Sequence, residues 1–289
     1  MKPMLAAEVS PDEAELIQKP TFASIKIDGI RCLNYEREPL TRSFETIPNH
    51  HVRSCMREHC EELDEFDGEL QSGKNFQETT SAIMTHEGEP EFTYHIFDNI
   101  GIGNYNSRFL LRKKPNITFV KEVPQELLTT TDQIKAFFKK CIDGGYEGSV
   151  FRRADGKDEY KYGRSTLNES YLVKMVEFVT DEGVIIGLEE GTINTNKLEK
   201  DKLGHAKRSS SGKGKIPSGL LGAFIIETKK FGIFTIGTGI GLTKGLRKYI
   251  LEHPDEYISR MLKYKYKPFG VKDKPRLPIS LGFRDKRDM

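Results

Sequence analysis

Residues 22–35 read FASIKIDGIRCLNY, and this stretch sets how the chain begins to fold. Apolar and β-branched residues on both sides of Asp28-Gly29 predict two short strands, 22–27 and 31–35, joined by a tight turn. Lys26 lies near the end of the first strand, where a cleft beside the turn can desolvate its side chain. A lysine is a nucleophile only as the neutral amine, which desolvation or nearby positive charge favours. The motif KxDGxR also fits a solvated lysine before a hairpin turn, so it needs support from the rest of the chain.

Side chains suited to nucleotide chemistry follow this stretch in order. They are Arg42 in TRSFETIPN, Glu69 in DGEL, Phe97 and Asp98 in YHIFDNI, Glu147 in EGSVFR, Arg164 in YGRSTL, Lys174 in YLVKMVEF, and Arg276, Arg284, Asp285 and Lys286 near the end. Two carboxylates can hold Mg²⁺ through oxygen, and an aromatic ring can stack on a base. Lysine and arginine can bind phosphates and the charge that develops on transfer. The set fits a site that uses a nucleoside triphosphate, although each residue alone also fits an ordinary core or surface role.

The first 179 residues carry mixed helix and strand signals. Ser10-Pro11-Asp12-Glu13 predicts a helix start, because serine caps a helix and proline suits its first turn. Apolar spacing predicts helices at 51–63, 76–84 and 131–142, and strands at 65–70, 92–97, 147–153 and 171–178. A mixed α+β domain follows from this pattern.

The chain beyond residue 179 carries mostly strand signals. Strands are expected at 184–188, 220–228, 233–238, 260–266 and 277–283, with one helix at 243–252. Five strands and one helix in this length suit a small closed β-barrel of the OB type. We therefore expect two domains, 1–179 and 180–289, with a hinge near residues 178–182.

Charge is divided unevenly between these two parts. From residue 180 onward there are 22 Lys and Arg against 13 Asp and Glu, while the rest of the chain holds 23 against 30. Part of the positive charge lies in a Lys-, Ser- and Gly-rich insert at about 190–217. Such a segment needs no packed face, so we expect it to be disordered alone and ordered on a polyanion.

Seven ordered segments resemble the nucleotidyltransferase superfamily of ATP-dependent ligases and mRNA capping enzymes, above all its small ATP-dependent DNA ligases. They are KPMLAAEV, KIDGIR, NFQETTSAIMT, GKDEYKYGRSTLNESYLVKM, HAKRSSSGKGK, FTIGTG and KPRLPISLGF. The likeness runs from Lys2 nearly to the C-terminus and is weakest around residues 100–130. It implies a fold with a nucleotidyltransferase (adenylation) domain over 1–179, built from antiparallel sheets and flanking helices. A five-stranded OB-fold β-barrel would follow over 180–289, with the 190–217 insert as a latch that clamps DNA.

The resemblance implies a reaction in three steps. Lys26 would attack the ATP α-phosphate, release pyrophosphate and hold AMP through a phosphoramide bond. AMP would then pass to the 5′-phosphate of a nick, and attack by the 3′-hydroxyl would expel AMP and seal the strand. ATP and Mg²⁺, or Mn²⁺ in its place, are the implied cofactors, and nicked duplex DNA is the implied partner. The implied enzyme is an ATP-dependent DNA ligase, of use in DNA replication, repair or recombination.

The resemblance also implies roles around the nucleotide. Glu69 would contact the AMP ribose or the metal, Glu147 would bind Mg²⁺, and Phe97 would stack on adenine. Arg31 would lie near the nick and the nucleotide, and Lys174 would approach the α-phosphate. Arg284, from the barrel domain, would orient pyrophosphate in the first step only. Asp28 would support the turn, and Asp98 is either catalytic or a strand cap.

A second group of residues would bind DNA. Arg42 and Arg164 would hold the 5′-phosphate at the nick. The basic insert would contact duplex phosphates through Lys207, Arg208, Lys213 and Lys215. Because one molecule must surround one duplex, we expect a monomer with no obligate protein partner.

Two positions depart from the family pattern. The family carries two lysines spaced KxK, but here Lys174-Met175-Val176 has valine at the second position. One phosphate contact is therefore missing or supplied by another residue such as Lys161, and slow self-adenylation is one consequence to expect. The closing GFRDKRDM also lacks the usual spacing around its acid and lysine.

The remaining features of the sequence argue against a membrane-spanning, secreted or disulfide-rich protein. No stretch approaches the roughly 20 apolar residues of a membrane span, and the N-terminus lacks the apolar run of a secretory signal. The four cysteines form no dense disulfide pattern, which favours a reducing, cytoplasmic setting. Two alternatives stay open: an RNA ligase or GTP-using capping enzyme, and a nick-binding protein that has lost catalysis.

Overall fold

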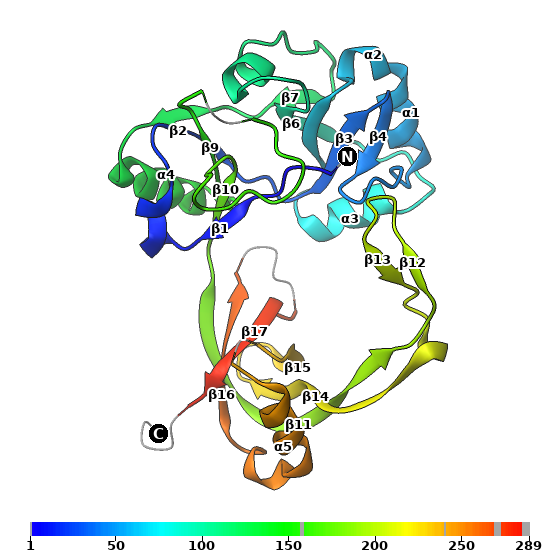
Figure 1. The fold of residues 1–289 in the computed structure, drawn as a ribbon, viewed down its shortest axis with the longest axis vertical. Coiled ribbons are helices and arrows are strands. Elements are labelled where there is room, and N and C mark those ends of the chain that lie inside the picture. Colours follow the sequence, from blue (N-terminus) through cyan, green and yellow to red (C-terminus); the bar gives the residue numbers. More distant parts are fainter. Residues whose placement is uncertain (1, 157–158, 240, 269–272, 285–289) are drawn as a thin grey trace. The chain divides into compact units, whose positions relative to one another are not determined.

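The computed structural model describes residues 2–156, 159–239, 241–268 and 273–284, and the chain divides into two compact units. Unit 1 is Met1–Glu177 and unit 2 is Phe178–Met289. Unit 1 contains two five-stranded sheets with helices, and unit 2 contains a closed barrel (Figure 1). Within the part of the chain just given, no helix combines the length and the apolar character needed to cross a membrane.

The first sheet of unit 1 carries the strand that leads to Lys26. Its order is β1 (Ala7–Val9), β10 (Val173–Val176), β9 (Gly148–Arg153), β2 (Thr21–Ile25) and β8 (Glu126–Leu128). The β1–β10 pair is parallel, and the other pairs are antiparallel.

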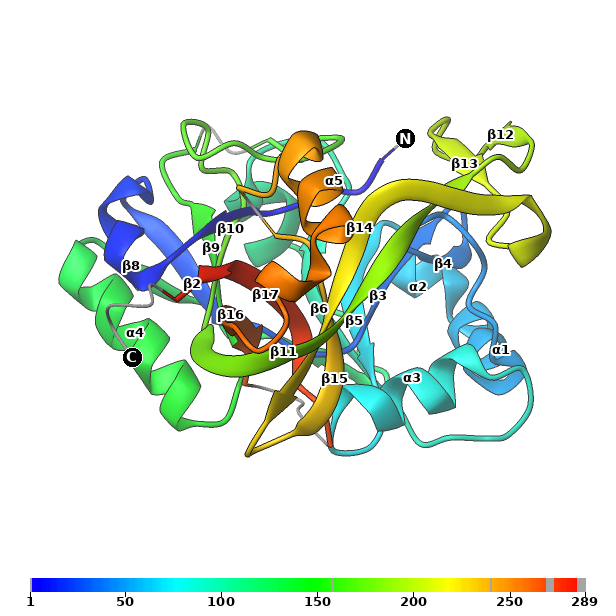
Figure 2. The same cartoon turned by 90° about the horizontal axis from the view of Figure 1, so that it is seen from below.

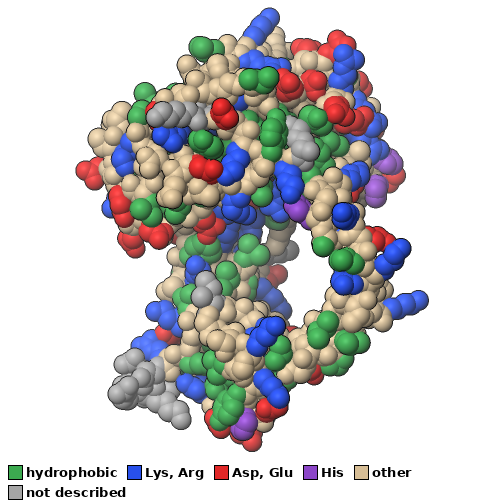
Figure 3. Space-filling model, in the orientation of Figure 1, with side chains coloured by type: hydrophobic (Ala, Val, Ile, Leu, Met, Phe, Trp, Pro, Cys, Tyr) green, Lys and Arg blue, Asp and Glu red, His purple; other side chains and the backbone are tan. Residues whose placement is uncertain are grey.

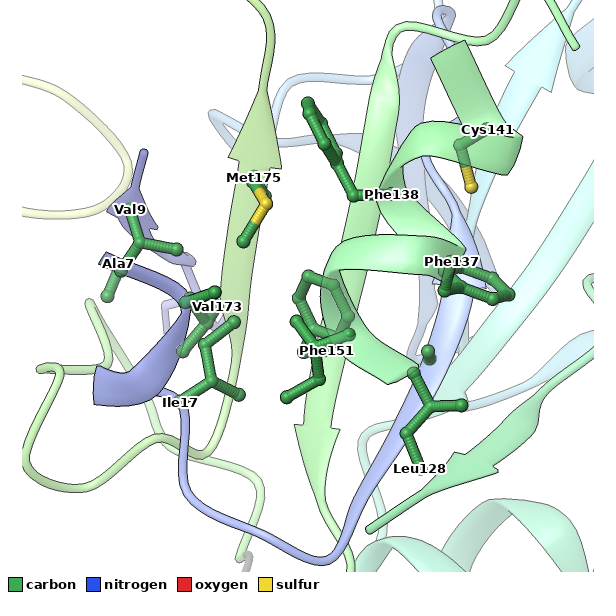
Figure 4. Packing of buried hydrophobic residues seen from close by; sticks show 13 residues of the cluster. Ala7, Val9, Ile17, Leu128, Phe137, Phe138, Cys141, Phe151, Val173 and Met175 are labelled. Carbon is green, nitrogen blue, oxygen red and sulfur yellow. The ribbon is translucent and has the colours of Figure 1, made fainter. Parts of the chain in front are cut away.

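One face of this sheet is covered by α4 (Thr131–Asp143) and the 3₁₀ helix η1 (Pro11–Leu16). Figure 4 shows the resulting core, in which Phe151 and Met175 from the sheet pack with Phe137 and Phe138 from α4. Both helices start as the sequence predicts, because Ser10 pairs with Glu13 and Thr130 with Gln133 in capping boxes.

The second sheet of unit 1 has the order β4 (Glu38–Thr41), β3 (Ile30–Tyr35), β5 (Phe66–Gln71), β6 (Thr93–Asn99) and β7 (Val120–Glu122). Its core face packs on α1 (His50–Glu58), α2 (Cys60–Leu63), α3 (Phe76–Met84) and the short π-helix η2 (Asn106–Leu110). The buried residues of this core include Val52, Leu70, Ile83, Ile96 and Phe109.

The hairpin expected at Asp28-Gly29 is wrong. β2 pairs with β8 and β9 in the first sheet, whereas β3 pairs with β4 and β5 in the second. The KIDGIR stretch therefore crosses from one sheet to the other. Glycine is needed at the crossing, because a Cβ on Gly29 would lie 2.3 Å from the Leu70 carbonyl oxygen.

The faces of the two sheets that turn away from the helices meet across a smaller cluster. It consists of Met4, Leu33, Ile100, Tyr160 and Leu172, with Val150 and Tyr35 packed against it. We call these two faces the inner faces. Side chains alternate between the faces of a strand, so every second residue of a strand lies on an inner face, near the other sheet.

Unit 2 is the barrel that the strand pattern predicts. Its strands are β11 (Val179–Asn194), β14 (Lys215–Thr228), β15 (Gly232–Gly237), β17 (Arg276–Phe283) and β16 (Met261–Lys267) in ring order. β16 pairs back onto β11, which closes the ring, and the β15–β17 contact is a single pair, Gly237 with Ile279. Helix α5 (Lys244–Glu252) and the 3₁₀ turn η4 (Pro254–Glu256) lie between β15 and β16 in sequence. The mixed α+β fold class is confirmed.

The basic insert has regular structure where a disordered loop was expected. β11 and β14 remain paired beyond the barrel as far as Asn194 with Lys215, and Figure 2 shows them as long adjacent strands. At their end lie the short strands β12 (Leu198–Lys200) and β13 (Ala206–Arg208), which pair with each other, and the turn η3 (Gly212–Gly214). We call residues 189–220 the arm. Ladder hydrogen bonds, which composition alone does not reveal, order its backbone.

Candidate active site

Lys26 lies on the inner face of the first sheet, directly after β2. Its backbone N–H donates to the Gly148 carbonyl oxygen at 2.9 Å, which continues the β2–β9 ladder. Its Nζ forms an ion pair with Glu147 Oε2. The Lys26 side chain is 24% exposed and that of Glu147 is 4% exposed. The predicted nucleophile is thus accessible and is held by a buried carboxylate.

Glu69 adds a second carboxylate to this group from the other sheet. It is half-buried on β5, where it pairs in register with Arg31 of β3. Burial raises the pKa of Glu69 to about 7, with Lys26 and Arg31 opposing this and Asp67 and Glu147 adding to it. Lys26 Nζ thus contacts the Glu147 carboxylate, with the Glu69 carboxylate nearby, and a lysine attacks only as the neutral amine. A reaction at Nζ needs a step that removes a proton from it.

Arg31 is fixed by a residue that the sequence did not single out. Its Nε donates to Asp67 Oδ1 at 2.8 Å, and its Nη2 donates to Asp67 Oδ2. Tyr160 Oη donates to the same carboxylate at 2.9 Å. Asp67 is fully buried, so these partners replace the water that would otherwise surround its carboxylate. Its position at the start of DGEL was the available signal, but its contacts with distant residues were not visible in the sequence.

Phe97 has two guanidinium groups near its ring. The centroid of its ring is 5.3 Å from the Arg31 guanidinium carbon and 5.2 Å from that of Arg152. The ring is half-buried, so part of it is available to a ligand. Cation–π contact with two arginines fixes its position.

Asp98 has a structural environment. It accepts from Arg108 Nε at 2.8 Å and from Arg152 Nε at 3.2 Å, and all three side chains are buried. Burial opposes ionisation, but the two arginines prevail and lower the pKa of Asp98. Asp98 is thus held in a buried cluster of ion pairs with Arg108 and Arg152.

Lys174 is on the same inner face, in the middle of β10. Its Nζ lies 2.7 Å from Glu8 Oε2 on β1. Val176, two residues along the same strand, is 2% exposed and pairs in register with Gly148. Lys161, considered as a replacement for the missing lysine, is held by Glu169 at 2.7 Å.

The other predicted site residues of unit 1 are less closely tied to Lys26. Asp28 is buried beside the crossing. Arg42 is exposed directly after β4, and Arg164 is exposed with its Nη1 donating to the Ala6 carbonyl oxygen at 2.6 Å. Within the described part of the chain, neither Arg42 nor Arg164 has a hydrogen bond or ion pair with Lys26, Glu69 or Glu147.

Unit 2 carries the remaining predicted residues. Arg284 forms an ion pair with Glu182. Lys207, Arg208, Lys213 and Lys215 are all exposed on the arm. Figure 3 shows Lys and Arg side chains along this segment. Arg208 Nη1 donates to the Asn196 carbonyl oxygen and so also supports the arm. Asp285 and Lys286 lie outside the described residues.

The carboxylates suit Mg²⁺ by donor chemistry but not by number. No group of three or more His, Cys, Asp and Glu side chains in the described ranges could hold an ion by itself. Mg²⁺ is commonly held by one or two carboxylates together with substrate phosphates and water. Glu69 and Glu147 fit that arrangement, because both approach Lys26.

Comparisons with known proteins bear on the whole chain. Residues 211–284 match the family of the DNA ligase OB-like domain. A crystal structure of Chlorella virus DNA ligase-adenylate is 27% identical, with a TM-score of 0.53, over 99% of both chains. The chain resembles the ATP-dependent DNA ligases. These matches confirm the motif-based resemblance and support the enzyme class inferred from it.

Two further solved structures are similar to this chain. A second crystal structure of the Chlorella virus ligase-adenylate is 26% identical, with a TM-score of 0.53, over 98% of this chain and 99% of that one. A Lig E DNA ligase is 20% identical over 98% of this chain and 99% of that one, with a TM-score of 0.72, and this likeness supports the fold alone. A search of curated proteins found no match.

Proposed function

We propose that this protein is an ATP-dependent DNA ligase that seals nicks through a lysyl-AMP intermediate on Lys26. The observation that carries the proposal is the placement of Lys26 against buried Glu147, with Glu69 beside it, at the motif KIDGIR. The full-length likeness to a ligase-adenylate structure supports the same chemistry.

In the first step, Lys26 Nζ attacks the α-phosphorus of ATP. The new bond is N–P, the bond between the α-phosphorus and the bridging oxygen breaks, and pyrophosphate leaves. Nζ must lose a proton, and Glu147 is in contact with it to accept that proton. Lys174, Arg31 and Glu69 would orient the α-phosphate and ribose, and Phe97 would stack on adenine.

A bound Mg²⁺ would screen the phosphate charge, and Glu69 and Glu147 are the residues that would hold it. Arg284 would orient pyrophosphate, and Asp28 would keep the crossing segment in place.

The later steps need nicked duplex DNA. An oxygen of the 5′-phosphate attacks the AMP phosphorus and the N–P bond to Lys26 breaks, which returns the amine. The 3′-hydroxyl oxygen then attacks the 5′-phosphorus, its proton is lost, and AMP leaves. Arg42 and Arg164 would hold the 5′-phosphate, and the exposed basic side chains of the arm would bind duplex phosphates.

The division of the chain into two compact units supports separate roles for its two parts. We propose that 1–179 is the adenylation domain and 180–289 the OB domain, with the arm as a DNA latch and a hinge near residues 178–182. One chain supplies every residue named above, so the proposed enzyme is a monomer.

The test uses purified protein, Mg²⁺ and α-labelled ATP or GTP, with Lys26→Ala beside it. Label from ATP that is absent in the variant is the expected result. Label from GTP alone would indicate capping chemistry instead. No label from either nucleotide on folded protein, with tight binding to nicked duplex, would leave a nick-binding role.

A further inference from the structure

Glu8 has a position on the inner face of the first sheet that no proposed step uses. It is the central residue of β1, and its neighbours Ala7 and Val9 point into the core shared with α4. Because side chains alternate, Glu8 points to the opposite face. β1 pairs with β10 so that Glu8 lies beside Lys174.

The ion pair between them is direct and partly open to solvent. Lys174 Nζ lies 2.7 Å from Glu8 Oε2, with the side chains 26% and 44% exposed. Glu147, the carboxylate that holds Lys26, is by contrast 4% exposed. The Glu8 carboxylate is thus much more accessible to solvent than that of Glu147.

The charges around Lys174 and Glu8 determine how this ion pair would affect the binding of a phosphate. Val176, the next side chain of β10 on this face, carries no charge, and Lys26 is occupied by Glu147. Lys174 is therefore the cation of β10 that an incoming phosphate would meet, and Glu8 already neutralises it. A phosphate that approaches Nζ also approaches the Glu8 carboxylate, which repels it.

We propose that Glu8 is an internal counter-ion that competes with the nucleotide phosphates for Lys174 and so weakens ATP binding. This inference rests on the proposed function, in which Lys174 contacts the α-phosphate. Partly exposed ion pairs have coupling energies that correspond to about two- to fivefold in an equilibrium constant. The effect expected from removing the Glu8 charge is of that size.

The experiment measures equilibrium binding of ATP to Lys26→Ala protein, in which no covalent step follows, with and without Glu8→Gln. Glu8→Gln should tighten ATP binding about two- to fivefold. Glu38→Gln is the matched control, because Glu38 forms a comparably exposed pair with Arg57 at 2.8 Å on β4. It should leave ATP binding unchanged.

A double-variant cycle shows whether the effect passes through Lys174. In a Lys174→Met background, Glu8→Gln should give little or no further gain. The KM for ATP of pyrophosphate release, with Lys26 intact, should fall by the same factor in Glu8→Gln.

Unchanged or weaker ATP binding in Glu8→Gln would overturn the inference, as would an equal gain in the Lys174→Met background. The proposed function would be overturned separately, by the absence of label on Lys26 from ATP. Label on the parent together with no effect of Glu8→Gln therefore rejects the counter-ion role alone.

Discussion

Glu69 is the residue whose electrostatics give a measurable pH dependence. Its pKa is raised from 4.5 to about 7 by burial. As pH rises from about 4.5 to 7, the carboxyl ionises first in the unfolded chain, so its effect on folding stability becomes progressively unfavourable. We predict that Glu69→Gln raises the Tm relative to the parent more at pH 8 than at pH 5, without nucleotide or metal. Glu38→Gln is the control, and an equal Tm difference at both pH values would reject the prediction.

Val176 tests whether the missing lysine slows the first step. A lysine at this position would add a second cation beside Lys174 on the inner face. A charge-assisted contact with phosphate contributes about 1.5–3 kcal/mol, so Val176→Lys should speed single-turnover labelling of Lys26 about tenfold or more. Since the site is buried, the variant should also lose about 1–3 kcal/mol of stability.

Val176→Met is the matched control, because it has similar length without charge. It should leave the labelling rate near that of the parent. The same rate for the lysine and methionine variants would show that no phosphate contact is missing at this position.

At this scale the sequence predicts which residues come together around Lys26, but not the residues that hold them in place. Lys26, Glu147 and Glu69 could be predicted because ordered motifs carry them. The partners that hold them in place could not, because Asp67 meets Tyr160 across 93 positions and Glu8 meets Lys174 from opposite ends of unit 1. Such contacts depend on sheet order and register, which leave no local pattern.

At the scale of elements, Gly191 of β11 and Gly222 of β14 allow the two strands to approach closely where the arm joins the barrel, which we call the root of the arm. A Cβ on Gly222 would lie 2.6 Å from the Gly191 Cα, and β-bulges interrupt the pairing on either side of Glu190. Gly222→Ala must therefore force β11 and β14 apart, at a cost of about 1–3 kcal/mol. We predict a lower Tm and weaker binding of nicked duplex.

Gly212→Ala serves as the control, because a Cβ there meets nothing within 4 Å. It lies in η3 near the end of the arm and should leave both the Tm and duplex binding close to those of the parent. Equal behaviour of the two alanine variants would show that the glycine contact does not set the root of the arm.

Most elements follow from local sequence, and the exceptions have a common cause. α4, β15, β16 and β17 begin and end within one residue of the predicted bounds, whereas β11 and β14 are longer than predicted. The hairpin at Asp28-Gly29 is wrong because the two strands find better partners in separate sheets. The arm is ordered because β11 and β14 extend their ladder beyond the barrel. In each case a non-local pairing decided the outcome.

At the scale of the whole molecule, the proposed ligase must bind a polyanion through the arm. Neutralising one phosphate contributes about −0.9 to the slope of log K against log salt concentration. The double variant Lys213→Ala, Lys215→Ala should therefore weaken binding of nicked duplex and flatten that slope by roughly 1.8. Lys135→Ala, Lys139→Ala, which removes two exposed charges from α4, should leave the slope unchanged. An equal change in both variants would mean that the arm has no special role.

A single turnover with isolated protein adenylate tests whether AMP passes from Lys26 to the nick. The protein is labelled with α-labelled ATP, freed of nucleotide, and mixed with nicked duplex DNA and Mg²⁺. We predict that label leaves Lys26, appears briefly on the DNA 5′-phosphate and ends as free AMP while the nick is sealed. Label that stays on the protein, with the duplex bound and the nick open, would contradict it.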